Sequence, residues 1–115
     1  QGADRHHQRL IMIRVRFHTA KDTILGFTLD GHAGAGVRGE DIVCAAVSSA
    51  AYMAANTVTE IVGATADITV DDGYMQVMLT DKIADCQDIL SGFQLHLEAM
   101  QEQYPKRVHL MNTEV

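Results

Sequence analysis

Strict alternation of apolar and polar residues runs through the first part of the chain. It holds from position 11 to 18 and returns from 25 to 30, after a polar turn at 19–22. A period of two is typical of half-buried strands, because successive side chains of a strand point to opposite faces. The two segments therefore predict a hairpin. Its apolar positions are Ile11, Ile13, Val15, Phe17, Leu25, Phe27 and Leu29.

A helical period replaces the alternation after residue 41. Apolar residues recur three or four positions apart as far as Ile61, and Gly63 then provides a helix end. Asp41 stands directly before this run, where its carboxylate suits the N-cap. The sequence thus predicts a central helix. Its apolar stripe comprises Val43, Val47, Ala50, Ala54, Val58 and Ile61, and further alanines widen it.

The second half of the chain repeats the order strand, strand and helix. Alternation across 66–79, with Ile68 and Val70 on the apolar face, is centred on the Asp-Gly dipeptide at 72–73, which is a strong hairpin signal. Residues 82–104 then carry apolar side chains, Phe93 among them, at alternating three- and four-residue spacing, which predicts an amphipathic helix that Pro105 ends. A short edge strand is expected at 108–115.

This order of elements defines a fold class. The pattern ββαββα(β) predicts an α+β domain in two layers, with a mostly antiparallel sheet of four or five strands and two helices on one face. All of 11–115 is expected to form a single domain. Residues 1–10 are polar and lack periodicity, so we expect them to be a disordered extension or a remnant of recombinant expression.

Composition and charge narrow the function classes. With 47% apolar and 21% charged residues among 115, the chain is typical of a folded domain, and no stretch is expected to span a membrane. The net charge of −6 argues against a nucleic-acid partner, whose phosphates need clustered Lys and Arg, and is compatible with a basic peptide. The two cysteines are too far apart for a Cys-x-x-Cys motif, so a reducing cytoplasm fits best.

The segment between the first hairpin and the central helix carries the candidate chemistry. Residues 31–40 contain four glycines, which predicts a mobile loop, and His32 lies near its start. With Asp41 as the N-cap, Cys44 would be the third helical residue, where unpaired backbone N–H groups and the helix dipole favour a thiolate. A cysteine paired with a histidine is a common activated nucleophile.

Each of these residues also has a structural interpretation. A cysteine in an alanine-rich helix is more often a small buried side chain, and a loop histidine is ordinarily a surface residue. Asp41 could cap the helix or orient His32. Ser48, one turn beyond Cys44, could line a site or bond a helix carbonyl. Cys86, on the apolar stripe of the second helix, is expected in the core. Two candidate ligands are too few for a metal site, so neither metal nor cofactor is expected.

Two short motifs flank the loop. They are Gly31-His32-Ala33 before it and Asp41-Ile42-Val43-Cys44-Ala45-Ala46-Val47-Ser48 after it. Together with the loop length they resemble the signature of the ribosomal-processing cysteine protease family, Prp, over Met12 to the C-terminus. The resemblance implies an α+β sandwich, generally dimeric, with His32 and Cys44 as the catalytic pair. Gly31, Asp41 and Ser48 are then candidates for positioning the substrate or the loop. The resemblance also implies an activity: the enzyme removes a short N-terminal extension from a large-subunit ribosomal protein by cutting after a hydrophobic motif that contains Phe.

Three functions remain open from these observations. The leading hypothesis is a cytoplasmic cysteine endopeptidase, homodimeric through its alanine-rich helix, whose partner is a ribosomal-protein precursor and whose nucleophile is Cys44. The alternative is a ribosome-associated binding module without turnover, against which the joint presence of His32 and Cys44 argues. A thiol redox sensor would need a second accessible thiol, which the sequence does not indicate.

Overall fold

The computed structural model describes residues 12–31 and 38–115 of the chain. The strands are β1 (Ile13–Ala20), β2 (Thr23–Asp30), β3 (Ala66–Asp71), β4 (Tyr74–Leu79) and β5 (Val108–Glu114). The helices are α2 (Arg38–Asn56), which continues as the π-helical segment η1 (Thr57–Ile61), and α3 (Gln87–Gln103), which follows the 3-10 turn η2 (Ala84–Cys86). Predictions that concern 1–11 and 32–37, the terminal extension and most of the glycine-rich loop, lie outside the described residues.

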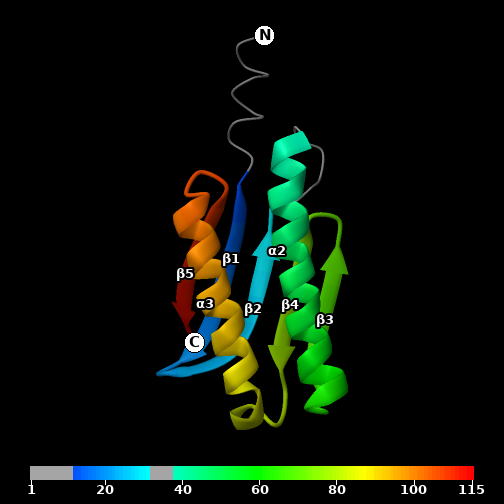
Figure 1. The fold of residues 1–115 in the computed structure, drawn as a ribbon. Coiled ribbons are helices and arrows are strands. Elements are labelled where there is room, and N and C mark those ends of the chain that lie inside the picture. Colours follow the sequence, from blue (N-terminus) through cyan, green and yellow to red (C-terminus); the bar gives the residue numbers. More distant parts are fainter. Residues whose placement is uncertain (1–11, 32–37) are drawn as a thin grey trace.

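The five strands form one mixed sheet in the order β3-β4-β2-β1-β5. Strands β1 and β5 are parallel, and the other neighbours are antiparallel. Both helices lie on the same face of this sheet, with α2 over the β2 and β4 side and α3 over the β1 side (Figure 1). The predicted α+β fold and its order ββαββα(β) are therefore confirmed, with the optional last strand present as β5.

Three phenylalanines occupy the middle of the interface between the layers. The ring centroid of Phe93, on α3, lies 5.6 Å from that of Phe17 and 4.8 Å from that of Phe27. All three side chains are almost fully buried. Burying one phenylalanine contributes roughly 1.5–3 kcal/mol, so this cluster is a main contact between α3 and the sheet.

Helix α2 is the core helix of the domain. By length and hydropathy alone, Ile42–Ile61 would suffice to cross a membrane, a test that the core helix of a folded domain also passes. Val47, Ala51 and Ala54 are nevertheless fully buried in the core that the helix shares with the sheet. A helix that packs its apolar side on a sheet needs this apolar content for the fold itself.

The start of α2 differs from the prediction. The helix begins at Arg38, three residues before Asp41, so Asp41 lies within the first turn and is not the N-cap. Acidic residues are favoured throughout the first turn as well as at the cap, because the helix dipole is positive there. An acidic residue before an apolar helical pattern therefore does not show whether it lies at the N-cap or within the first turn.

A β-bulge changes the apolar face of β2. His18 pairs with Gly26 while Thr19 pairs with Ile24, so Leu25 is the extra residue of the bulge. Leu25 is only half-buried, and Ile24 takes the core position that was expected for Leu25. One inserted residue moves every residue before it to the other face of the strand. The alternation in the sequence carries no signal of such an insertion, so it did not reveal the shift.

Three apolar residues expected on buried faces are exposed. Ile61 is 80% exposed, since the π-helical turn of η1 alters the helical period on which its assignment depended. Ile68 and Val70 of β3 are 45% and 53% exposed. Strand β3 is the outermost strand beside α2 (Figure 1), where no helix covers it.

The side chain of Gln87 holds the bulge against α3. Its Oε1 accepts a hydrogen bond from the Ile24 backbone N–H at 2.9 Å, and its Nε2 donates to the Ile24 carbonyl oxygen at 2.8 Å. The same Nε2 donates to the Ile83 carbonyl oxygen at 2.9 Å. The side-chain amide of Gln87 thus pairs with the backbone N–H and C=O of Ile24, two groups that a neighbouring strand would otherwise have to pair with.

Replacing Gln87 by Ala should lower the free energy of unfolding by about 1–3 kcal/mol, because two partly buried backbone groups of Ile24 would lose their partners. Urea unfolding followed by circular dichroism measures the change. The control is Gln94→Ala, which removes an exposed hydrogen bond to Asn112 and should change stability little. Equal losses for the two variants would contradict this role of Gln87.

Candidate active site

Cys44 lies on the second turn of α2 and points into the domain. It is the seventh residue of a helix that begins at Arg38, and only 7% of its surface is exposed. The sequence analysis expected the third helical position, which follows from the misplaced N-cap. Because the influence of the helix dipole falls off within the first turn, the helix start alone gives this thiol little activation.

Positions 41, 44 and 48 share one face of α2, because they are three and four residues apart. Ser48 is half-buried one turn beyond Cys44. Three of the predicted site positions are therefore carried on one face of one rigid helix.

Gly31 begins the loop that leads from β2 to α2. Its backbone N–H donates to the Gly73 carbonyl oxygen at 3.0 Å, which ties the end of β2 to the turn between β3 and β4. Its φ of 95° lies in the region that favours glycine, and an added Cβ would overlap the carbonyl oxygen of Met12. The point from which this loop departs is thus held between two other backbone segments, the turn at Gly73 and the chain at Met12.

His32 follows Gly31 directly but lies outside the described residues. The end of β2, the turn between β3 and β4, and the first part of α2 are all at the same end of the molecule (Figure 1). The chain therefore enters the undescribed segment beside the half of α2 that carries Cys44.

The described histidines lie elsewhere in the domain. His18 is on the sheet face opposite the helices, where its Nε2 lies 2.7 Å from the Thr28 Oγ1. Burial lowers the pKa of His18, and the positive charge of Arg16 lowers it further. His109 is exposed on β5, beside Arg14 of that same face. His96 lies on α3, on the flank of α2 away from Cys44.

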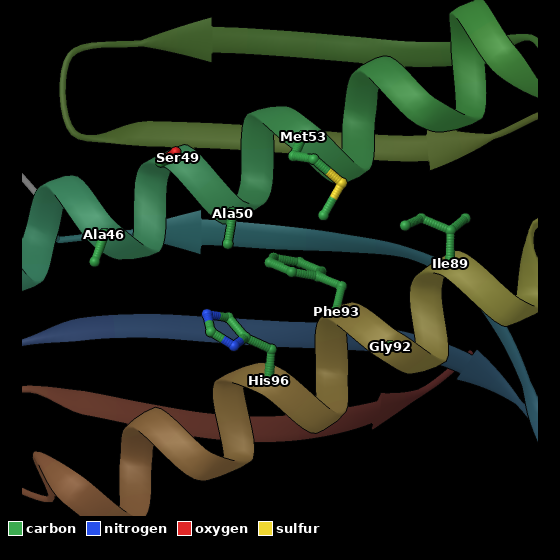
Figure 2. Close-up of a pocket in the computed structure, with 8 residues that line it drawn as sticks. All are labelled: Ala46, Ser49, Ala50, Met53, Ile89, Gly92, Phe93 and His96. Carbon is green, nitrogen blue, oxygen red and sulfur yellow. The ribbon is translucent and has the colours of Figure 1, made fainter.

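A groove of about 690 Å³ runs between α2 and α3 (Figure 2). It is lined by Ala46, Ser49, Ala50, Met53, Ile89, Gly92, Phe93 and His96. Cys44 does not line it, because positions 44 and 46 lie on different flanks of the helix. The sequence analysis did not single out this groove, since its small and apolar lining residues are ordinary at the flanks of two packed helices.

Cys86 is a core residue, as predicted. It is fully buried just before α3, and its pKa is raised by burial, with the negative charge of Asp85 adding to the effect. Such a thiol is a poor nucleophile. In the described part of the chain no three His, Cys, Asp or Glu side chains converge, so these residues hold no evident metal site.

Comparison with known proteins extends over nearly the whole described domain. Residues 12–109 match the family described as cysteine protease Prp. Two Staphylococcus aureus proteins named ribosomal processing cysteine protease Prp are 32% identical over 85 residues, which are 71% of this chain and 80% of each relative.

Solved structures agree with this match. The Streptococcus mutans protein SMU.848 superposes with a TM-score of 0.83 at 30% identity, covering 90% of this chain and 96% of that one. The Staphylococcus aureus protease Prp in complex with a substrate peptide gives a TM-score of 0.81 at 26% identity, over 89% of this chain and 100% of that one.

The family and the curated relatives that match this chain are cysteine proteases, and the class of the chain is accordingly a cysteine-type hydrolase. Within that class the chain belongs to the Prp family of ribosomal-processing cysteine proteases. The resemblance of its motifs is thus confirmed. The individual roles of His32, Cys44, Gly31, Asp41 and Ser48 stay predictions.

Replacing Gly31 by Ala should destabilise the fold by about 1–2 kcal/mol and displace the start of the loop, because of its positive φ and the overlap with Met12. The midpoint of thermal unfolding and the rate of peptide cleavage would be measured for the same variant, and both values should fall. Gly92→Ala is the matched control: an added Cβ meets nothing within 4 Å there, and alanine favours a helix interior. The idea fails if the two variants shift stability in the same direction.

Proposed function

We propose that this chain removes the N-terminal extension of a large-subunit ribosomal protein in the bacterial cytoplasm. The observation that supports the proposal is the family match over 12–109, which includes both Cys44 on α2 and His32, the residue after the backbone-anchored Gly31. A relative has been solved with a substrate peptide and also with a covalently linked product peptide. A covalent product is what a cysteine nucleophile would form.

The chemistry assigned to these residues is acyl transfer. The Cys44 Sγ attacks the scissile carbonyl carbon, and the leaving amine takes its proton from His32. Water then hydrolyses the thioester and restores the thiol. The first four N–H groups of a helix have no partner within the helix, so those of positions 38–41 are the backbone donors assigned to the developing oxyanion. Because Cys44 lies beyond the first turn, its activation is assigned mainly to His32.

A binding module without turnover is the competing function. The burial of Cys44 among core residues is the observation that favours it, because a small buried thiol needs no chemical role. In either case the expected partner is a ribosomal-protein precursor and not a nucleic acid, since the chain carries a net charge of −6.

Replacing Cys44 by Ala should abolish cleavage of the ribosomal-protein precursor from the same genome, while binding and folding stay nearly unchanged in an alanine-rich helix. His32→Ala should be almost as damaging, because two residues that act as a unit fail when either is lost. Mass spectrometry of the products reads out cleavage and locates the bond.

Cys86→Ser serves as the control for the thiol. It should retain cleavage, although a buried hydroxyl without a partner costs about 1–3 kcal/mol of stability. A Cys44→Ala variant that cuts near the wild-type rate would refute the protease assignment. A wild-type protein that binds the precursor and never cuts it would establish the binding module.

We further propose that the chain forms a homodimer through the outer side of α2. Ile42, Tyr52 and Met53 are 67%, 45% and 52% exposed on this helix, and Met53 also lines the groove between the helices. Large apolar side chains exposed on one helix are a feature of interaction surfaces. A second copy could place its own apolar residues against the groove.

Light scattering at micromolar concentration should give twice the mass of one chain. Met53→Glu should shift the protein to the monomer, because a charge would be buried at the interface. Leu95→Glu on α3 is the control, since Leu95 is 68% exposed and does not line the groove. A monomeric wild-type protein would contradict the dimer.

A further inference from the structure

Strand β3 presents apolar side chains on the helix side of the sheet, where no helix covers them. Ile68 pairs with Val77, and Val70 pairs with Met75. Cross-strand partners point to the same face. Val77 and Met75 are buried beneath α2, yet Ile68 and Val70 are about half exposed. The exposed pair therefore extends the core surface outward, past α2.

The backbone of β3 is open along the same residues. The two-residue turn at 72–73 closes on the pair Asp71 and Tyr74, and in such a hairpin hydrogen-bonded pairs alternate with non-bonded ones from that point. Ile68 and Val70 are at the non-bonded positions, so their N–H and C=O groups point away from β4. No strand of the described chain pairs with this edge.

Strand β3 has no backbone feature that would block pairing with another strand. Natural edge strands are commonly blocked by proline, lysine, a bulge or short length. Strand β3 has six residues, with neither proline nor lysine, and it pairs with β4 without a register shift. Its charged residues, Asp67 and Asp71, are both acidic and exposed. The edge thus favours an extended partner that carries positive charge.

The edge also leads to the candidate active site. The turn that ends β3 accepts the hydrogen bond from Gly31, the residue that precedes His32. That turn lies at the same end of the molecule as the first part of α2 (Figure 1). A chain that follows β3 would therefore reach the end of the domain where Gly31 ends the described part of β2 and where α2, the helix of Cys44, begins.

We propose that β3 is the docking strand for the substrate, and the inference rests on the proposed protease function. An extended peptide adds to its free edge through backbone hydrogen bonds to Ile68 and Val70. Alternate peptide side chains then face opposite sides of the sheet. Apolar ones pack on Ile68 and Val70 on the helix side, and basic ones face Asp67 and Asp71 on the other. The substrate class is a peptide that alternates apolar with polar or basic residues.

Two variants test the docking strand. Ile68→Pro removes an outward N–H together with the Ile68 side chain and leaves the bonds to β4 intact, whereas Val70→Ser removes an apolar side chain alone. The excess loss of binding in Ile68→Pro over Val70→Ser then measures the backbone pairing. Leu95→Ser is the matched control at an exposed aliphatic residue on α3. Each is made in a Cys44→Ala background, and binding of a peptide spanning the precursor cleavage site is measured by fluorescence anisotropy.

Ile68→Pro should weaken peptide binding about tenfold, the effect of one lost hydrogen bond, and Val70→Ser should weaken it several-fold. Leu95→Ser should leave it unchanged. With Cys44 present, the rate of alkylation by iodoacetamide should be the same in all variants, since this small reagent does not need the docking strand.

Unchanged peptide affinity in a folded Ile68→Pro variant would overturn the proposal, as would a loss of alkylation that parallels the loss of binding. If Ile68→Pro does not fold, unchanged affinity in Val70→Ser overturns it instead. Failure of the protease function is a separate result: the wild-type protein would then bind the peptide through β3 and leave it uncut.

Discussion

The packing of two helices on one face of a five-stranded sheet is the contact on which the other features depend. Phe93 fastens α3 to the sheet through Phe17 and Phe27, and small residues such as Ala51 and Ala54 let α2 approach it closely. The two helices lie over the β1, β2 and β4 side of the sheet, so the edge strand β3 lies beyond them (Figure 1). Strand β3 is left partly exposed for this reason, with its apolar residues beside α2.

The packing of the helices on the sheet also fixes the parts of the chain that carry the candidate site. Cys44 is carried by a helix whose inner side is locked in the core, and Gly31 is held by the Gly73 carbonyl and by its close approach to Met12. The loop between them therefore starts and ends on elements that do not need the substrate in order to be positioned. The opposite sheet face is polar instead, with His18 bonded to Thr28, and it makes no contribution to this site.

Local periodicity was sufficient for most of the fold. The alternation of β1 and the three- and four-residue spacing of α3 are patterns that short-range geometry imposes, and Phe17 and Phe93 are buried as predicted. The errors occur where a single residue changes the period. Leu25 is displaced by a bulge and Ile61 by a π-helical turn, and neither carries a local sequence signal.

For the candidate site, the sequence by itself determined the residue types, their spacing and the family, because the motifs around His32 and Cys44 are contiguous in the chain. Only the tertiary structure decided that Cys44 is a buried second-turn residue, that Gly31 is tied to a turn some forty positions away, and that Ile68 and Val70 face outward. The reason is physical. Periodicity reports which side of an element is apolar, whereas exposure depends on whether a distant element covers that side.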